Sequence, residues 1–188
     1  VSLARRHLVP PDRPLGNGDI VLRMRRAEDV PVIAEASCDP ETQRRLNDEP
    51  LTPDRERESL ARVEEQWRTG TGAPFVIADA ADDRPLGLLN LQFGDDEEAA
   101  GLAVSVFPEA RGRGVASQAL RLGASWGLRE LCLQRVFAEA AVDNQASIRA
   151  IEKAGFQREG VLRAHCKTHG RRHDCVMFSL LPADIDPA

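Results

Sequence analysis

The chain contains one short glycine turn whose residue types could bind a phosphate. It consists of Arg111, Gly112, Arg113, Gly114, Val115 and Ala116. An apolar run precedes it and a segment of helical periodicity follows it. A helix start leaves backbone N–H groups unpaired and carries a partial positive charge, and glycines lack the Cβ atoms that would keep a phosphate from those donors. The turn is therefore predicted to hold a diphosphate, with both arginines adding charge. An ordinary surface turn is the alternative.

Three kinds of phosphate ligand compete for this turn. A Walker motif requires Lys and then Ser or Thr after the last glycine, whereas Val115 and Ala116 stand there. A dinucleotide fingerprint requires a third glycine where Ser117 stands, and a fold of repeated strand-helix-strand units. Coenzyme A fits better, because its diphosphate suits the turn and its pantetheine amides can pair with an exposed sheet edge.

Hydrophobic patterning around the turn predicts one α+β domain. Strands are expected over 20–25, 74–80, 86–93, 100–107, 135–142, 156–166 and 175–181, and helices over 27–38, 53–68, 114–131 and 147–154. In this order an antiparallel meander feeds a single strand-helix-strand crossover. The Pro- and Gly-containing residues 1–18 are read as an extended arm outside the core, 19–182 as the domain, and 183–188 as a tail.

Composition excludes several classes of function. The 188 residues suit one domain, and 25 basic against 30 acidic residues give a net charge of −5. That balance argues against general electrostatic binding to nucleic acid, because such binding needs a basic surface. No apolar run is long enough for a membrane helix and no signal peptide is evident, so a cytoplasmic protein is expected. Four scattered cysteines in a chain of this length do not imply a disulfide framework.

Further residues resemble those of a known family. The motif Arg or Gln, two residues, Gly, one residue, then Gly or Ala is met by Arg111, Gly114 and Ala116. Matching fragments follow at Arg135-Val136, Asn144, Ser147, Glu152-Lys153, Gly155-Phe156, Glu159-Gly160 and Leu162-Arg163. In order and spacing the chain resembles the GNAT superfamily of N-acetyltransferases, and its RimJ/RimL branch in particular. The likeness spans about 19–182 and is strongest over 108–163.

The resemblance implies a fold and a cosubstrate. The GNAT fold has a mixed, mostly antiparallel sheet of about seven strands, flanked by about four helices and splayed between the fourth and fifth strands. Acetyl-CoA would bind along that gap, its pantetheine on the backbone of the fourth strand, its diphosphate in the turn 111–116, and its thioester near two polar side chains. Those residues are Val104, Ser105 and Val106 on the strand, then Asn144 and Ser147. Asn before a short helix also fits a helix cap.

The implied reaction is direct attack of a primary amine on acetyl-CoA in a ternary complex. Protein N-terminal α-amines and small-molecule amines both remain open as acceptors, as does a homodimer as the assembly. A second hypothesis is a non-catalytic module that binds or senses acyl-CoA. The reason for this second hypothesis is that many relatives carry an active-site Tyr or a Glu on the fourth strand, whereas this chain has no Tyr and no acidic residue over 101–106.

The acid and base must therefore lie elsewhere. Ser147 is the candidate proton donor to the departing thiolate, and His165 the preferred base, since histidine titrates near neutrality. A strand histidine without a role is the alternative. The acidic run 95–98 could attract a cationic amine or supply Glu97 or Glu98 as a base through water, although charge runs in turns are usually just solvated.

Two cysteines and two histidines lie within ten residues near the end of the chain. Cys166, His169, His173 and Cys175 have the residue types of a zinc site, but their spacing is not that of a common zinc module. A hairpin with Gly170 in its turn, where the two cysteines face each other, is preferred, and no metal is expected. Cys132 follows a helix in an apolar segment and is expected in the core rather than as a nucleophile.

Overall fold

The computed structural model of the protein describes residues 8–45 and 49–185, arranged around one twisted sheet. The strands are β1 (Leu15–Gly16), β2 (Ile20–Arg23), β3 (Gly72–Asp79), β4 (Pro85–Phe93), β5 (Ala99–Val106), β6 (Arg135–Ala141), β7 (Gln157–Thr168) and β8 (Arg171–Leu180). Their order is β1-β2-β3-β4-β5-β6-β8-β7. All neighbours are antiparallel except β5 and β6, which are parallel.

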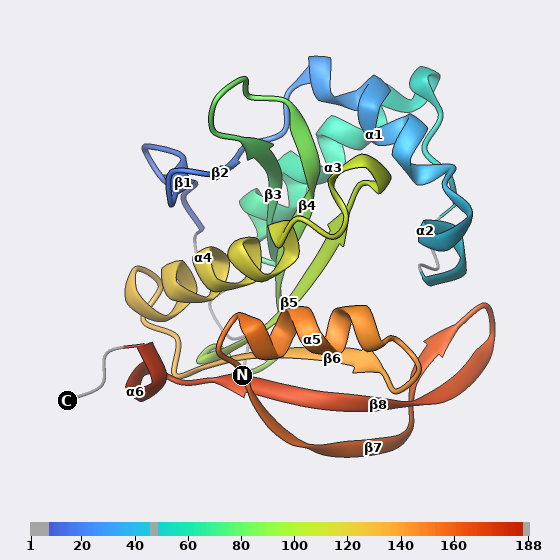
Figure 1. Ribbon diagram of the computed structural model, residues 1–188. Coiled ribbons are helices and arrows are strands. Elements are labelled where there is room, and N and C mark those ends of the chain that lie inside the picture. The colour runs from blue at the N-terminus through green and yellow to red at the C-terminus, as the bar shows by residue number, and fades with distance from the viewer. Residues whose placement is uncertain (1–7, 46–48, 186–188) are drawn as a thin grey trace.

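Helices pack on this sheet and close the core. They are α1 (Val30–Ser37), α2 (Pro40–Arg45), α3 (Glu56–Thr69), α4 (Val115–Arg129), α5 (Gln145–Lys153) and α6 (Pro182–Ile185). In Figure 1, α4 crosses in front of the N-terminal strands and α3 lies behind them; α4 contacts β5 and β4, and α3 contacts β3. Trp67, Phe75 and Trp126 join α3, β3 and α4 in one aromatic cluster, with ring centroids 5.3 to 6.0 Å apart.

The sheet opens between β5 and β6. These strands pair only at Ala99↔Arg135, Ala100↔Val136 and Gly101↔Phe137, and then diverge. A Cβ placed on Gly101 would lie 3.2 Å from the Phe137 ring, a tight contact, so glycine lets this ring sit close against β5 at the point of separation. In Figure 1, β5 rises steeply beyond this point while β6 and β8 run nearly horizontally, so the two halves of the sheet diverge. One side of β5 is thereby left without a strand partner over residues 102–106.

The predicted fold class is confirmed, with differences at its periphery. The mixed, splayed sheet is present, with eight strands in the described residues instead of about seven. The extra strand is β1, which pairs with β2. Leu8 is also buried in the main core, so this part of the expected arm lies against the domain. Residues 1–7 of the arm and 186–188 of the tail lie outside the described residues.

A buried ion pair links the end of β2 to the residue just before α1. Arg23 and Asp29 are 5% and 1% exposed, and their side chains form two hydrogen bonds of 2.7 and 2.8 Å. Arg23 Nε also donates to Asp83 in the β3–β4 turn. The hydrogen bonds that Arg23 donates to the Asp29 carboxylate raise the pKa of Arg23, so the guanidinium keeps its charge despite burial.

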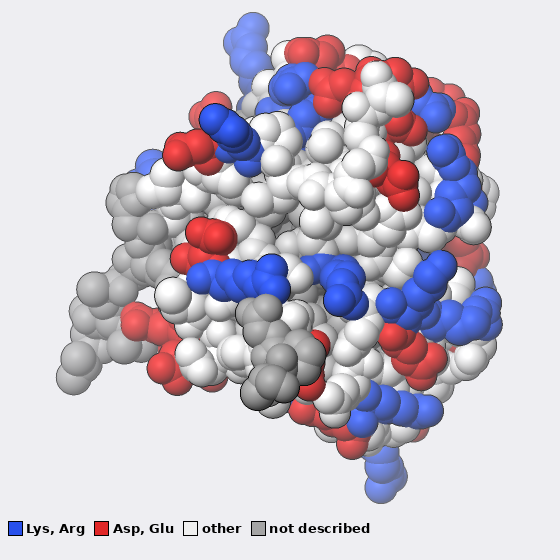
Figure 2. All heavy atoms as spheres, turned by 60° about the vertical axis from the view of Figure 1, so that its left-hand side comes forward, with Lys and Arg blue, Asp and Glu red and all other residues white. Residues whose placement is uncertain are grey.

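The surface carries mixed charge. Figure 2 shows Lys and Arg interspersed with Asp and Glu on the face it draws, without a broad area of one sign. Within residues 8–45 and 49–185, no helix is both long and apolar enough to cross a membrane.

Candidate active site

A cavity of about 1140 Å³ occupies the gap between the two halves of the sheet. Its walls are β5 from Gly101 to Val106, the turn before α4, β6 from Phe137 onward, and α5. Residues of α2 and of the β7–β8 hairpin line another part of it. The splayed strands thus open onto the same space as the glycine turn.

The open edge of β5 presents backbone donors to this cavity. Phe107 N–H donates to Leu86 O on β4 at 2.9 Å. Because donors alternate between the two sides of an antiparallel strand, the N–H groups of Val104 and Val106 point away from β4, toward the gap. The N–H groups of Val104 and Val106 therefore face the gap, whereas Val106 O accepts from Arg111 Nε at 3.3 Å; Val104, Ser105 and Val106 all line the cavity.

The glycine turn has the backbone shape that a phosphate cradle requires. Gly112 and Gly114 have φ of +75° and +80°, a region that other L-residues rarely adopt, and Gly114 is the N-cap of the 15-residue helix α4. The first N–H groups of that helix have no acceptor within it. The Lys153 ammonium lies 3.7 Å from where a Cβ on Gly114 would be, which adds positive charge at the same place. Gly112, Gly114, Val115 and Ala116 line the cavity.

The two arginines of the turn do not point their charges into this cradle. Arg111 lines the cavity, but its guanidinium donates to Asp39 at 2.6 Å and to Thr42 at 2.9 Å. The bond from Arg111 lowers the pKa of Asp39 to about 2. The guanidinium of Arg113 lies 3.9 Å from the carboxylate of Asp79, and Arg113 is not part of the cavity wall. Both arginine side chains are thus paired with acidic partners in the described residues, and their predicted role toward the diphosphate stays a prediction.

Asn144 and Ser147 lie at the start of α5, in the cavity wall. The Asn144 side chain accepts a hydrogen bond from Ser147 N–H at 3.2 Å, so the capping interpretation of this asparagine is correct. The cap satisfies one of the first donors of α5 and fixes where the helix begins. Both side chains are partly exposed and border the same space as β5.

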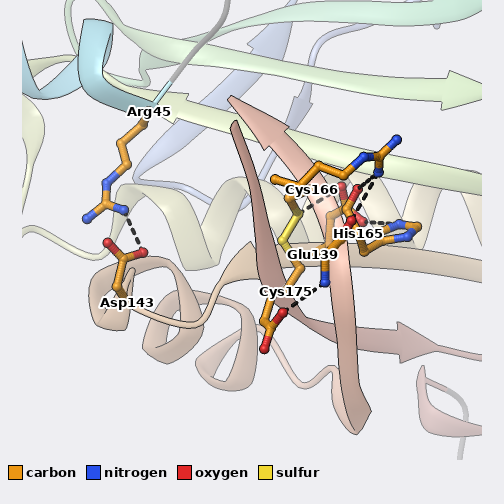
Figure 3. The surroundings of a disulfide bond; sticks show 9 residues. Arg45, Glu139, Asp143, His165, Cys166 and Cys175 are labelled. Carbon is orange, nitrogen blue, oxygen red and sulfur yellow. Dashed lines mark hydrogen bonds and ion pairs between the residues drawn. A yellow bond between two sulfur atoms is a disulfide. The ribbon is translucent and has the colours of Figure 1, made fainter. Parts of the chain in front are cut away.

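A carboxylate that sequence reasoning missed lines the cavity from β6. Glu139 is about two-fifths exposed, and its Oε2 lies 3.1 Å from Nε2 of His165. His165 itself is not part of the cavity wall, although the next residue, Cys166, is. The structure thus places the predicted base behind a carboxylate that faces the cavity (Figure 3). The signal in the sequence was a single acid inside the apolar run 136–142.

The last two strands carry the two predicted facing cysteines. Cys166 on β7 and Cys175 on β8 form a disulfide, with their Cα atoms 6.0 Å apart. No group of three or more His, Cys, Asp and Glu side chains among the described residues is placed to hold a metal ion. Cys132 is exposed, in the turn after α4, so the expectation that it lies in the core is wrong. Cys132 has φ of +55° and follows the end of α4 at Arg129.

The short helix α2, which the sequence did not reveal, covers the other end of the cavity. Arg45 donates to Asp143 at 2.9 Å, and Figure 3 draws this pair at some distance to the left of the disulfide. Glu41 binds both Arg44 and Arg45, which lowers its pKa to about 2. The acidic run 95–98, by contrast, lies in the β4–β5 turn and contributes no residue to the cavity wall.

Comparisons with known proteins agree with this geometry. A family pattern described as "Acetyltransferase (GNAT) domain" matches residues 19–157. The "Uncharacterized N-acetyltransferase p20" of Bacillus licheniformis is 29% identical over 164 residues, covering 86% of this chain and 92% of that protein.

Two solved structures share the fold. A RimL ribosomal L7/L12 alpha-N-protein acetyltransferase in complex with coenzyme A gives a TM-score of 0.78 at 21% identity, covering 93% of this chain and 100% of that one. A spermidine N-acetyltransferase from Vibrio cholerae in complex with CoA and spermine gives 0.75 at 22%, covering 90% and 100%. At these identities the structural likeness speaks for the fold.

Proposed function

Because the chain belongs to the GNAT acetyltransferase family and is thus an acetyl-CoA-dependent N-acetyltransferase, we propose that it acetylates a primary amine by direct attack in a ternary complex. One observation carries this proposal: a single cavity joins the open edge of β5, the glycine turn and a carboxylate on β6. A donor thioester and an acceptor amine can meet there without a covalent enzyme intermediate.

The residues around the gap fit the coenzyme. The positive φ of Gly112 and Gly114 and the start of α4 suit a diphosphate, and the outward N–H groups of Val104 and Val106 suit the pantetheine amides. We assign coenzyme binding to Val104, Ser105, Val106, Arg111, Gly112, Arg113, Gly114, Val115, Ala116, Asn144 and Ser147. Within this set the two arginines contribute their backbone, since their side chains are engaged elsewhere.

Removal of the amine proton falls to Glu139 and His165 together. The amine must be neutral to attack, and the Glu139 carboxylate is the acceptor that borders the cavity. The His165 ring, 3.1 Å from its Oε2, holds the carboxylate in place and can share the proton. The base proposed from the sequence is thereby retained as the partner of the group that reaches the substrate.

The remaining groups stabilise charge as the reaction proceeds. When bound, acetyl-CoA supplies a thioester whose carbonyl oxygen gains negative charge on attack. An outward N–H group of β5 that the pantetheine amides leave unused would donate to that oxygen, and one such donor is typically worth about 10²- to 10³-fold in rate. Ser147, in the wall at the start of α5, is the proton donor to the departing sulfur.

The acceptor is proposed to be a protein N-terminal α-amine or a small-molecule amine. With ordinary pKa values, roughly 15% of an α-amine but only about 0.04% of a lysine amine is neutral at pH 7, so an α-amine needs little help from a base. Relatives in fold include an enzyme named for ribosomal L7/L12 and one named for spermidine, which supports both classes.

A thiol-release assay tests the proposal. Purified protein and acetyl-CoA are mixed with peptides beginning in Ala or Ser, with a polyamine, or with no acceptor, and free thiol is followed with time. Acceptor-dependent release in at least one arm is expected. Binding of acetyl-CoA without acceptor-dependent release in any arm would instead support the non-catalytic binding module.

A further inference from the structure

The disulfide between β7 and β8 has one sulfur at the cavity and one in the interior. Cys166 lines the cavity and is partly exposed, whereas Cys175 is fully buried. Cys166 Sγ lies 3.6 Å from Oε1 of Glu139, the carboxylate proposed to receive the amine proton (Figure 3). A thiol inside the cavity can therefore reach this disulfide only at Cys166.

A bulge in β7 precedes Cys166, which lies at the cavity wall. The register of β7 against β8 shifts between Leu162 and Cys166, which leaves a bulge. Two side chains of β8 hold that bulge: Asp174 accepts from Ala164 N–H at 2.8 Å, and Arg172 donates to Ala164 O at 3.0 Å. Because these contacts do not involve sulfur, opening the disulfide leaves the bulge supported.

Stability gives little reason for the bond. The two cysteines are only nine residues apart in sequence, and closing so short a loop constrains the unfolded chain less than closing a long one. A chain of 188 residues with a large main core also does not need a covalent link. Its position against the reacting groups is therefore its more informative property.

We propose that Cys166 is a thiol-exchange site for coenzyme A, an inference that rests on the proposed function. The coenzyme thiolate attacks Cys166 Sγ, a new S–S bond forms between coenzyme and Cys166, and the bond to Cys175 breaks. Cys175 leaves as a thiolate and takes a proton from water. One disulfide replaces another, so the step needs no external oxidant or reductant.

Coenzyme A is the thiol that the site favours over other small thiols. Each acetyl transfer leaves its free thiol in the cavity while the diphosphate is still held by the turn. A thiol tethered in this way has an effective concentration on the order of millimolar, whereas glutathione must arrive from bulk solution. If glutathione is present at about 10 µM and coenzyme A is bound, the ratio of the effective to the bulk thiol concentration is roughly 100, so coenzyme A is expected to open the disulfide roughly 100-fold faster.

The first test follows the disulfide by intact mass. A Cys38→Ser/Cys132→Ser background removes the two exposed free thiols and leaves the bonded pair. Oxidised protein is treated with coenzyme A or glutathione at equal concentration and quenched in acid at intervals. Coenzyme A is expected to open the bond at least ten-fold faster, to add the full mass of one coenzyme, and to map to Cys166. Desulfo-coenzyme A, which binds without a thiol, is expected to suppress this opening.

A second test does not depend on a preformed bond. In a Cys175→Ser variant of the same background, coenzyme A disulfide is expected to label Cys166 and release one coenzyme thiol, and the product is expected to persist because no neighbouring thiol can displace it. Equal opening rates for both thiols, or a Cys166 that stays unlabelled, would overturn the exchange site. Calorimetry and thiol release on the same protein separate the two ideas: intact binding and turnover without exchange reject this inference alone, whereas absent coenzyme binding rejects the proposed function.

Discussion

Two glycines of matched backbone shape allow the coenzyme turn to be tested against pure backbone strain. Gly112 and Gly170 have φ of +75° and +76°, and a Cβ on either would meet no atom within 4 Å. An Ala substitution at each should therefore cost the same folding free energy, about 1–2 kcal/mol for a left-handed residue with a side chain. For a chain of this size, that lowers Tm by about 2–8 °C. Gly170 lies in the β7–β8 turn, away from the phosphate cradle.

Coenzyme binding should separate the two variants. Gly112 lines the cavity, so the methyl group of Gly112→Ala stands between the backbone donors and the diphosphate. Loss of one hydrogen bond to a charged group costs about 1.5–3 kcal/mol, which raises Kd about 10- to 100-fold. Gly170→Ala should bind as the wild type does. Calorimetry with coenzyme A and thermal unfolding measure the two effects.

The outcome that refutes this reasoning is specific. If Gly112→Ala and Gly170→Ala lose stability equally and also bind coenzyme A equally, the turn does not hold the diphosphate. If Gly112→Ala loses far more stability than its matched control, the two positions are not equivalent in strain, and the magnitude worked from their φ angles is wrong.

Three other predictions concern charged side chains. Glu139→Gln should lower kcat/KM about 100-fold while leaving the Kd of coenzyme A unchanged, since it removes a proton acceptor and no coenzyme contact; unchanged steady-state kinetics would exclude it as the base. Asp29→Asn should lower the free energy of unfolding by about 3 kcal/mol, because it removes the charge opposite the buried Arg23 guanidinium. Urea denaturation measures this loss, and a loss well below that value would contradict the prediction. The bonds from Arg135 and then Ser179 lower the pKa of Glu159 from 4.5 to about 2, so its stabilising effect is complete above pH 4.5 and is lost as the pH falls toward 2. The stability difference between wild type and Glu159→Gln, measured by denaturation at several pH values, should shrink over that range, and a constant difference would contradict the assignment.

Long periodic segments of the fold were predictable, whereas short polar ones were not. The spacing of Val115, Ala119, Leu122 and Trp126 predicts one apolar face on α4. Three of these side chains are buried, and Leu122 is partly buried against the same core. The helix α2 has six mostly polar residues and no buried side chain, so no apolar period marks it. Its contacts are with residues far away in sequence, such as Asp143, and only the tertiary structure brings these together.

The candidate site divides in the same way. The glycine turn and Asn144 act through local backbone geometry, which short sequence patterns encode directly. The direction of Arg111 depends on Asp39, 72 residues earlier in the chain, and no local pattern reveals such a partner. Glu139 and His165 come from different strands, so their pairing required the register of β6, β8 and β7.

The helix α2 connects the glycine turn with the loop before α5. Arg111, the first residue of the glycine turn, binds Asp39 just before this helix and Thr42 within it. At the opposite end of the helix, Arg45 binds Asp143 in the loop that precedes α5. Both ion pairs are partly exposed and open to screening by salt, so the helix is held by several weak contacts rather than by a core. A change in how Arg111 is engaged when the turn binds a diphosphate would therefore be felt first at α2, four residues of which line the cavity.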